Sequence, residues 1–449
     1  MKKESNEIIY GVDDVPPPGA LLMLSLQQMM LLFTAATFPA LLVREVGGSV
    51  DVASSMVAMT MVAAGLGSIL QALRLPGVGS GYLCPNLCGP SYLGVSLQAA
   101  WHGGFPVMHG MIVFAGVLEI LLANIIRHIR FLFPSVVVGL VVMMVGVNVI
   151  AVSVTNFFGV AYAFDSVRGA DLLVGCIALL TMVGCNLWGR GPLRMYCLLI
   201  GILVGWGAAL LLTPEIRAGY EVLQSKPVFA LPVYDWREQF RLSFSAELAV
   251  PFIIIAVCGS LKSFGNLLAA QKISEPDLKE VKMKPVANGL VADGITTAMA
   301  GFMGAMAVDT SSSNIGLAAA TRAVSRWIAI VTGVIFAFLG FFPKISMLIA
   351  LVPRPVVGAS LIFAVSIMIC TGLKEMLEQP LDQRKIYTIG IAMIFGLSTQ
   401  FVPALYAALP AAYQPLFQSP LATSTLFAII IYQVFHLDEI KDMLRRTKE

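Results

Sequence analysis

Long apolar runs are the feature that most constrains this chain. A helix needs ~20 apolar residues to cross the hydrocarbon core of a bilayer, and runs approaching that length recur along the 449 residues. Hydrophobic residues make up 58% of the chain and charged residues 12%, roughly half the charged share of a soluble domain. The sequence therefore predicts an all-α polytopic protein whose surroundings are the lipid bilayer.

Fourteen membrane-spanning segments are expected, and three of them are unusual. The third begins with CPNLCGPS, the ninth is short, and the tenth is polar. Short or Gly/Pro-interrupted segments at matching positions of two halves point to the binding site of a transporter. The expected segments are Ala20–Val43, Val50–Leu73, Tyr82–Trp101, Val107–Ile126, Phe133–Val154, Asp171–Trp188, Met195–Leu212, Leu248–Ala270, Gly289–Met303, Thr310–Arg322, Trp327–Phe342, Val352–Leu373, Ile386–Val402 and Leu421–Phe435.

An internal repeat is visible in the apolar sequence. Phe133–Val147 (FPSVVVGLVVMMVGV) resembles Val352–Ser366 (VPRPVVGASLIFAVS), and Pro-x-x-Val-Val-Gly begins at Pro134 and again at Pro353, an offset of 219. The third and tenth segments fall at nearly the same offset. Because seven segments per half is an odd number, two such repeats must be inverted in the membrane. Chance recurrence in Val- and Gly-rich sequence is the alternative.

The distribution of positive charge predicts the orientation. With the N-terminus inside, 20 of the 29 lysines and arginines fall in inside segments and eight fall outside. Cytoplasmic loops carry the excess of Lys and Arg. We therefore expect both termini to be cytoplasmic, in the inner (plasma) membrane of a bacterial-type cell.

Several classes of function lack support. The net charge of +3 is small and no basic, aromatic-interleaved patch occurs, so no nucleic-acid partner is expected. Seven cysteines and four histidines are scattered, which predicts no metal site and no disulfide framework. No nucleophile–base pair or phosphate loop indicates an enzyme, and no cofactor is expected.

The stretch Asp309–Arg326 (DTSSSNIGLAAATRAVSR) places polar and small residues inside an apolar half of the chain. Such backbone is tolerated at membrane depth only where it is buried in protein or lines a water-filled cavity. A broken helix at this place exposes N–H groups and a positive dipole end to a ligand. A cytoplasmic loop that happens to carry serines is the alternative, and the neighbouring apolar segments leave little room for it.

Ionisable and amide side chains inside the expected segments are the candidate site, because each is costly in hydrocarbon unless paired or solvated. Lys262 needs an acid or an anion as partner: Asp293 is the first choice, Glu119 or Asp309 the second. A fixed structural ion pair is the alternative for Lys262, and helix locking is the alternative for Glu119. The remaining candidates are Asn266, one turn after Lys262, and the first-segment pair Gln27 and Gln28, for which hydrogen bonding between helices is the alternative.

The motif Asn314-x-Gly316-x4-Thr321-Arg322 resembles the signature of the nucleobase–ascorbate transporter family, also called nucleobase:cation symporter-2. Tyr10–Pro18 (YGVDDVPPP) and the fifth segment also resemble that family. The resemblance implies fourteen spans in two inverted seven-span repeats, with short strands opening the third and tenth spans. It also implies a core (residues 20–130 and 244–343) and a gate (131–243 and 344–436) between cytoplasmic termini 1–19 and 437–449.

Carried over residue by residue, the resemblance implies a substrate site and a set of acids for proton coupling. The chain departs from the family at Lys262, where a Glu is usual, at Ser313, usually Gln, Glu or Pro, and at Gln27-Gln28, usually Gln-His. The implied substrate-binding residues are Lys262, Ser313, Asn314, Tyr92 (as a ring that stacks on a base), Asn266 and Gln28, and the coupling candidates are Asp293, Asp309 and Glu119.

The exchange of Glu for Lys262 predicts a change of substrate. A carboxylate accepts from ring N–H groups, whereas an ammonium only donates, so Lys262 favours a substrate with oxygens or negative charge, such as urate. We expect a secondary transporter of a xanthine-, uracil- or urate-like heterocycle, proton-coupled, with the core sliding against the gate. An uncoupled carrier of a small organic anion is the alternative. A homodimer through the gate is implied by the resemblance alone.

Overall fold

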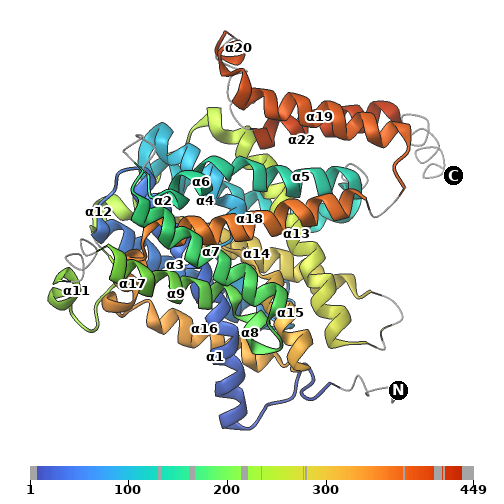
Figure 1. Ribbon diagram of the computed structural model, residues 1–449. Coiled ribbons are helices and arrows are strands. Elements are labelled where there is room, and N and C mark those ends of the chain that lie inside the picture. Colours follow the sequence, from blue (N-terminus) through green and yellow to red (C-terminus); the bar gives the residue numbers. More distant parts are fainter. Residues whose placement is uncertain are drawn as a thin grey trace.

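The computed structural model describes residues 8–129, 134–160, 167–213, 221–233, 235–276, 278, 281–377, 380–408, 417 and 420–436. The expected C-terminal segment 437–449 and the first seven residues of the N-terminal segment lie outside the described residues. The described chain is almost entirely helical (Figure 1). Its larger elements are α1 Pro18–Ala35, α2 Thr37–Glu45, α3 Val50–Ala72, α4 Leu93–Ile129, α5 Ser135–Asn148, α6 Ile150–Phe157, α7 Gly169–Trp188, α9 Cys197–Leu212, α13 Ala249–Ser274, α14 Met283–Phe302, α15 Ser312–Thr321, α16 Arg326–Leu339, α17 Pro343–Ala350, α18 Arg354–Met376, α19 Gln383–Phe401 and α22 Pro420–Phe435.

Seven helical stretches among the described residues are long and apolar enough to cross a membrane, or eight if α16 and α17, bent by 87°, form one span. The chain is therefore a multi-pass membrane protein. Each expected segment contains a helix, but several helices are short or broken. The third and fourth expected segments join in α4, which breaks at Gly103 and Gly104, whose φ angles are −151° and 74°. Gly104 adopts the left-handed region that favours glycine.

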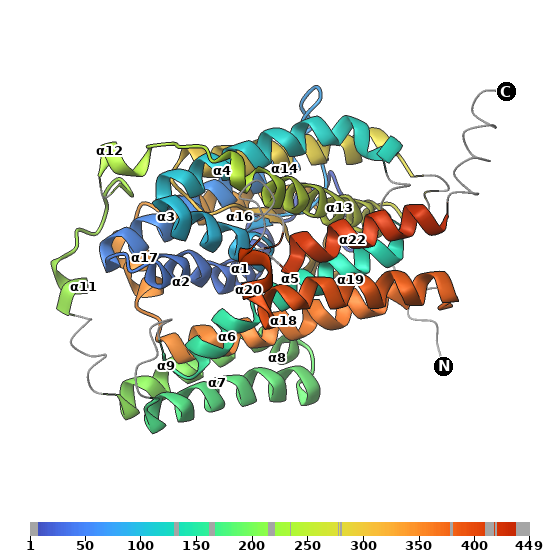
Figure 2. The same ribbon diagram turned by 90° about the horizontal axis from the view of Figure 1, so that it is seen from above.

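The helices pack in two groups, and the segments of the two groups alternate along the sequence. In the first group, α3 lies along α16 and α17, α4 lies along α14 and α13, and α1 packs on α16. In the second group, α18 packs on α5, α6 and α7, while α7 pairs with α9 and α19 pairs with α22. Figure 2 shows α7 with α9, and α19 with α22, away from α4 and α14. Segments from both halves of the chain therefore build each group.

Glycines allow the closest helix contacts. A Cβ on Gly65 of α3 would lie 2.5 Å from the Gly333 carbonyl oxygen of α16, and one on Gly139 of α5 would lie 2.6 Å from the Gly372 oxygen of α18. Membrane helices have no hydrophobic drive to associate, so small residues that let backbones approach supply van der Waals contact instead.

Two short strands meet in the middle of the first group. β1 Asn86–Leu87 pairs antiparallel with β2 Asp309–Thr310, so that Asn86 faces Thr310 and Leu87 faces Asp309. The Asn86 N–H donates to Ser68 Oγ (2.9 Å). Each strand leads into a helix: β1 into the turn η1 Pro90–Tyr92 and then α4, and β2 into α15. The positive ends of two helices therefore adjoin the strand pair.

The N-terminal segment holds the far end of α15. The Ile9 N–H donates to the Arg322 carbonyl (2.9 Å), and the Val324 N–H donates to the Tyr10 carbonyl (2.9 Å). Arg322 ends α15 with a φ of 55°, a left-handed conformation common at helix C-termini. The contact fixes the half-helix at the end opposite the strands.

Candidate functional site

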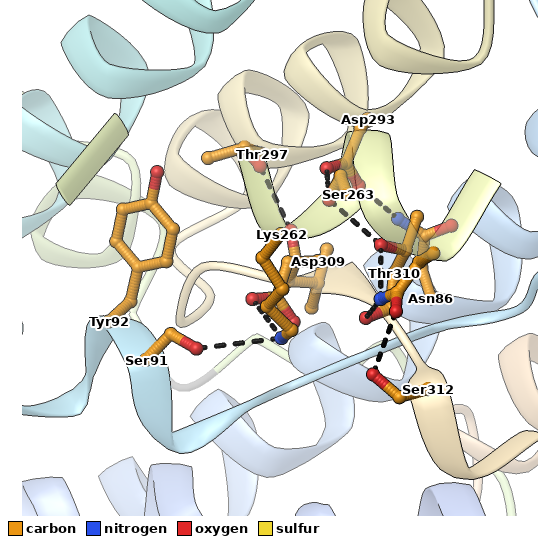
Figure 3. A network of polar contacts seen from close by, with 12 residues as sticks. Asn86, Ser91, Tyr92, Lys262, Ser263, Asp293, Thr297, Asp309, Thr310 and Ser312 are labelled. Atoms are coloured by element: carbon orange, nitrogen blue, oxygen red, sulfur yellow. Dashed lines mark hydrogen bonds and ion pairs between the residues drawn. The ribbon is translucent and has the colours of Figure 1, made fainter. Parts of the chain in front are cut away.

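An ion pair stands at the strand pair. Lys262 of α13 places its Nζ 2.7 Å from Asp309 Oδ2 of β2. The Asp309 side chain is 1% exposed, whereas that of Lys262 is 28% exposed. The ammonium also lies 3.5 Å from Ser91 Oγ of η1 (Figure 3). The structure thus holds a buried carboxylate against the ammonium of a partly exposed lysine.

Asp293 of α14 is not the partner of Lys262, so the first choice made from sequence was wrong. Its Oδ1 accepts from Asn86 Nδ2 (2.8 Å) and its Oδ2 accepts from the Ser263 hydroxyl (2.5 Å). The carboxyl therefore joins β1, α13 and α14 through neutral donors. Ser263 is the next residue after Lys262 on α13, and successive residues of a helix point in different directions. Ser263 therefore binds Asp293, whereas Lys262 binds Asp309.

Asn266 lies one turn after Lys262 and reaches the same strand, as its spacing predicted. Its Nδ2 donates to the Thr310 carbonyl (3.1 Å) and to Thr310 Oγ1 (3.0 Å). Its Oδ1 accepts from the Ser312 hydroxyl (2.8 Å). Thr310 Oγ1 donates in turn to Ser263 Oγ (2.8 Å), so these contacts form one network with those of Asp293, and the Lys262–Asp309 pair lies beside it (Figure 3).

Gln28 and Asn314 bind one another. Asn314 Nδ2 donates to Gln28 Oε1 (2.7 Å) and to the Gln28 carbonyl (2.9 Å), and Gln28 Nε2 donates to the Asn314 carbonyl (3.3 Å). Both side chains are buried. The pair ties α15 to α1, so the motif asparagine serves here to position the half-helix. The neighbouring Gln27 instead lines a cavity of about 260 Å³ together with Tyr196.

Tyr92 and Glu119 form a second buried pair within α4 and the turn before it. The Tyr92 hydroxyl donates to Glu119 Oε1 (2.6 Å), and the ring is 1% exposed. A Cβ on Gly259 of α13 would lie 3.1 Å from Glu119 Oε1. In this conformation the ring is enclosed by protein, and its stacking on a base stays a prediction.

The space beside the network is small. Ser313 lies in the first turn of α15 with an exposed side chain. Cys258, four residues before Lys262, and the adjacent Leu261 line a cavity of about 10 Å³ with three valines of α5. A volume of this size has room for about one water, far less than the hundreds of Å³ of a small-molecule site.

Sequence reasoning missed the neutral residues of the network. Asn86, Ser263 and Thr310 have no charge to mark them, and each looks like an ordinary small polar residue. Only their positions in the sequence could have identified them. Asn86 lies in the interrupted third segment, Ser263 follows Lys262, and Thr310 follows Asp309.

Comparison with known proteins places the chain in a class of membrane permeases. The xanthine/uracil permease model, described as "Permease family", matches residues 19–405. The chain belongs to this family, the nucleobase–ascorbate transporters. It is 26% identical to a putative purine permease of Clostridium perfringens, over 97% of this chain and 94% of the relative. It is 24% identical to xanthine permease XanP of Escherichia coli (96% and 95%) and 27% identical to uric acid permease PucJ of Bacillus subtilis (95% and 95%).

Solved structures show the same fold at low identity. The transmembrane domain of the cyanobacterial bicarbonate transporter BicA aligns with a TM-score of 0.56 and 12% identity, covering 95% of this chain and all of that one. The SLC26A9 structure aligns with a TM-score of 0.54 and 13% identity, covering 92% of this chain and 64% of that one. Membership of the permease family makes the chain a transporter rather than an enzyme.

Proposed function

We propose that the chain transports an oxygen-rich purine, such as urate or xanthine, and that it binds this substrate through Lys262. The observation that carries the proposal is the Lys262 ammonium, partly exposed and held at the strand pair. An ammonium donates hydrogen bonds and cannot accept them, so it suits the carbonyl oxygens of an oxidised purine and a negative charge. Relatives that are named xanthine and uric acid permeases support this substrate class.

The architecture we propose has fourteen spans in two inverted repeats. Each half contains a strand followed by a helix, and the repeated prolines Pro134 and Pro353 both stand immediately before a helix, α5 and α18. The first helix group corresponds to the core and the second to the gate, with both termini cytoplasmic in the inner membrane. A homodimer through the gate is part of the proposal.

The mechanism we propose is alternating access coupled to protons, with the core moving against the gate in an elevator-like step. The narrow cavity between α5 and α13 supports it, because the two groups must separate to admit a heterocycle. Asp293, Asp309 and Glu119 are the buried acids available to carry a proton. The second candidate function is an uncoupled carrier of a small organic anion, and the positive charge of Lys262, whose side chain is 28% exposed, is the observation that favours it.

A thermal-shift panel on purified protein tests the substrate class. A ligand that binds only the folded state raises the apparent melting temperature by mass action. We expect urate and xanthine to raise it more than uracil, guanine, ascorbate or small carboxylates. The variant Lys262→Glu should lose the urate response, while Lys272→Glu, an exposed lysine on the same helix, should keep it. A urate response that survives Lys262→Glu refutes the role of Lys262, and a response only to small carboxylates favours the second function.

A further inference from the structure

We propose that substrate and proton are coupled by exchange at one ion pair. An anionic substrate takes the Lys262 ammonium from Asp309, and the Asp309 carboxylate then binds the proton that travels with the substrate. This inference rests on the proposed function. It adds two points: which group carries the proton, and what net charge the transported complex has.

The position of Asp309 makes the exchange necessary. Its side chain is 1% exposed, and one oxygen has its ion-pair partner in Lys262 at 2.7 Å. The other oxygen, Oδ1, is buried without a hydrogen-bond partner among the described residues. It faces Gly89, where an added Cβ would lie 2.8 Å away. A buried carboxylate that loses its only counter-ion is unstable, so it must gain a proton or another cation.

The surroundings of Asp309 offer no second cation within the described part of the chain. The titratable groups that face it are acids or weak acids from every neighbouring element: Asp293 of α14, Glu119 and Tyr92 of α4 and its leading turn, and Cys84 and Cys88 beside β1. Asp293 differs because two neutral donors hold it whether or not Lys262 moves. A proton is therefore the group that can neutralise Asp309.

Lys262 is free to change partner. Its ammonium has three N–H donors, and its side chain is 28% exposed. Besides Asp309 it has only a long contact to the Ser91 hydroxyl (3.5 Å) among the described residues. A substrate anion that reaches the exposed part of this side chain can take these donors, and the ammonium then keeps a negatively charged partner.

The charges balance without any covalent change. Binding converts the Lys262–Asp309 pair into a Lys262–anion pair and a neutral, protonated Asp309. Release on the other side returns the proton and restores the original pair. One monovalent anion and one proton cross together, so the transported complex is electroneutral. A neutral base leaves the ion pair intact and carries no proton.

Proteoliposomes and radiolabelled urate test the exchange. A pH gradient, acid outside, and a potassium diffusion potential are imposed separately. We expect the pH gradient to drive accumulation at least fivefold above equilibrium, and a potential of either sign to change the initial rate less than twofold. The variant Asp309→Asn should still bind urate in a thermal-shift assay and exchange it across the membrane. It should lose accumulation by the pH gradient and respond to an inside-positive potential. Glu238→Gln, an exposed acid in the short helix α12 (Trp236–Gln239), is the matched control.

Each contrary result has a defined meaning. Accumulation driven by an inside-positive potential in the wild type, or retained pH-driven accumulation in Asp309→Asn, overturns the exchange. If Asp309→Asn does not fold, the wild-type response to the two gradients decides alone. Urate transport that ignores the pH gradient overturns this inference and leaves the proposed function standing. A wild type that neither binds nor transports urate or xanthine overturns both.

Discussion

The variant Lys262→Met leaves the Asp309 carboxylate buried without its counter-ion, and its cost can be estimated from the structure. Unit charges 2.7 Å apart attract by roughly 6 kcal/mol at an effective dielectric constant of about 20. Hydration of the ammonium, 28% of whose side chain is already exposed, offsets part of this attraction. Removing one partner of a buried pair typically costs about 3–5 kcal/mol. We expect a loss of that size in the free energy of unfolding at neutral pH.

Thermal unfolding of the purified protein in detergent measures the loss, and a double-mutant cycle assigns it. Lys262→Met should lower the melting temperature by several degrees, and adding Asp309→Asn should recover most of the difference because no charge is then left unpaired. The loss should also shrink as the pH falls and the orphaned carboxyl is protonated. If the free-energy changes of the two single variants add up to that of the double variant within about 0.5 kcal/mol, the two side chains are independent and the reasoning is refuted.

Three further predictions concern neighbouring parts of the fold. Gly89→Ala places a Cβ 2.8 Å from Asp309 Oδ1 and should abolish urate uptake, with Gly390→Ala, where a Cβ meets nothing within 4 Å, as the unaffected control. Asn314→Ala removes the hydrogen bonds that join α15 to Gln28 of α1 and should lower the free energy of unfolding by about 1–3 kcal/mol. An unchanged melting temperature would show that these hydrogen bonds do not stabilise the fold. Burial by itself raises the pKa of the Glu275 carboxyl, but hydrogen bonds from Lys282 and from the Tyr82 hydroxyl outweigh it, so that the pKa of Glu275 lies below its usual value. Its carboxylate therefore stabilises the fold above its unfolded pKa, and the melting-temperature difference between wild type and Glu275→Gln should vanish as the pH falls through the folded pKa.

The sequence predicted the helical membrane fold and the polar stretch that interrupts it. Apolar runs locate helices because a bilayer leaves backbone groups few alternatives to internal hydrogen bonds. The polar stretch at Asp309 was identified for the same reason, and Asn266 was placed on the face of Lys262 by helical spacing. These inferences need only local pattern.

The partners of the site residues could not be predicted in the same way. Asp293 and Asp309 are both acids in later segments, and spacing along the chain does not say which one meets Lys262. The strand pair determines which acid it is. Asp309 lies opposite Leu87 in this pair, and that position brings the Asp309 carboxylate to Lys262 of α13. The bond between Gln28 and Asn314 joins residues 286 apart in the sequence, which only the folded structure brings together.

Uptake of radiolabelled urate into proteoliposomes, by wild type and Lys262→Met at equal incorporated protein, tests the central claim most directly. Uracil serves as the neutral comparator and Lys272→Met as the matched control. The account predicts that wild type and the control take up urate in preference to uracil, and that Lys262→Met loses urate uptake at least tenfold. Equal urate uptake by wild type and Lys262→Met would contradict the claim that the Lys262 ammonium binds the substrate.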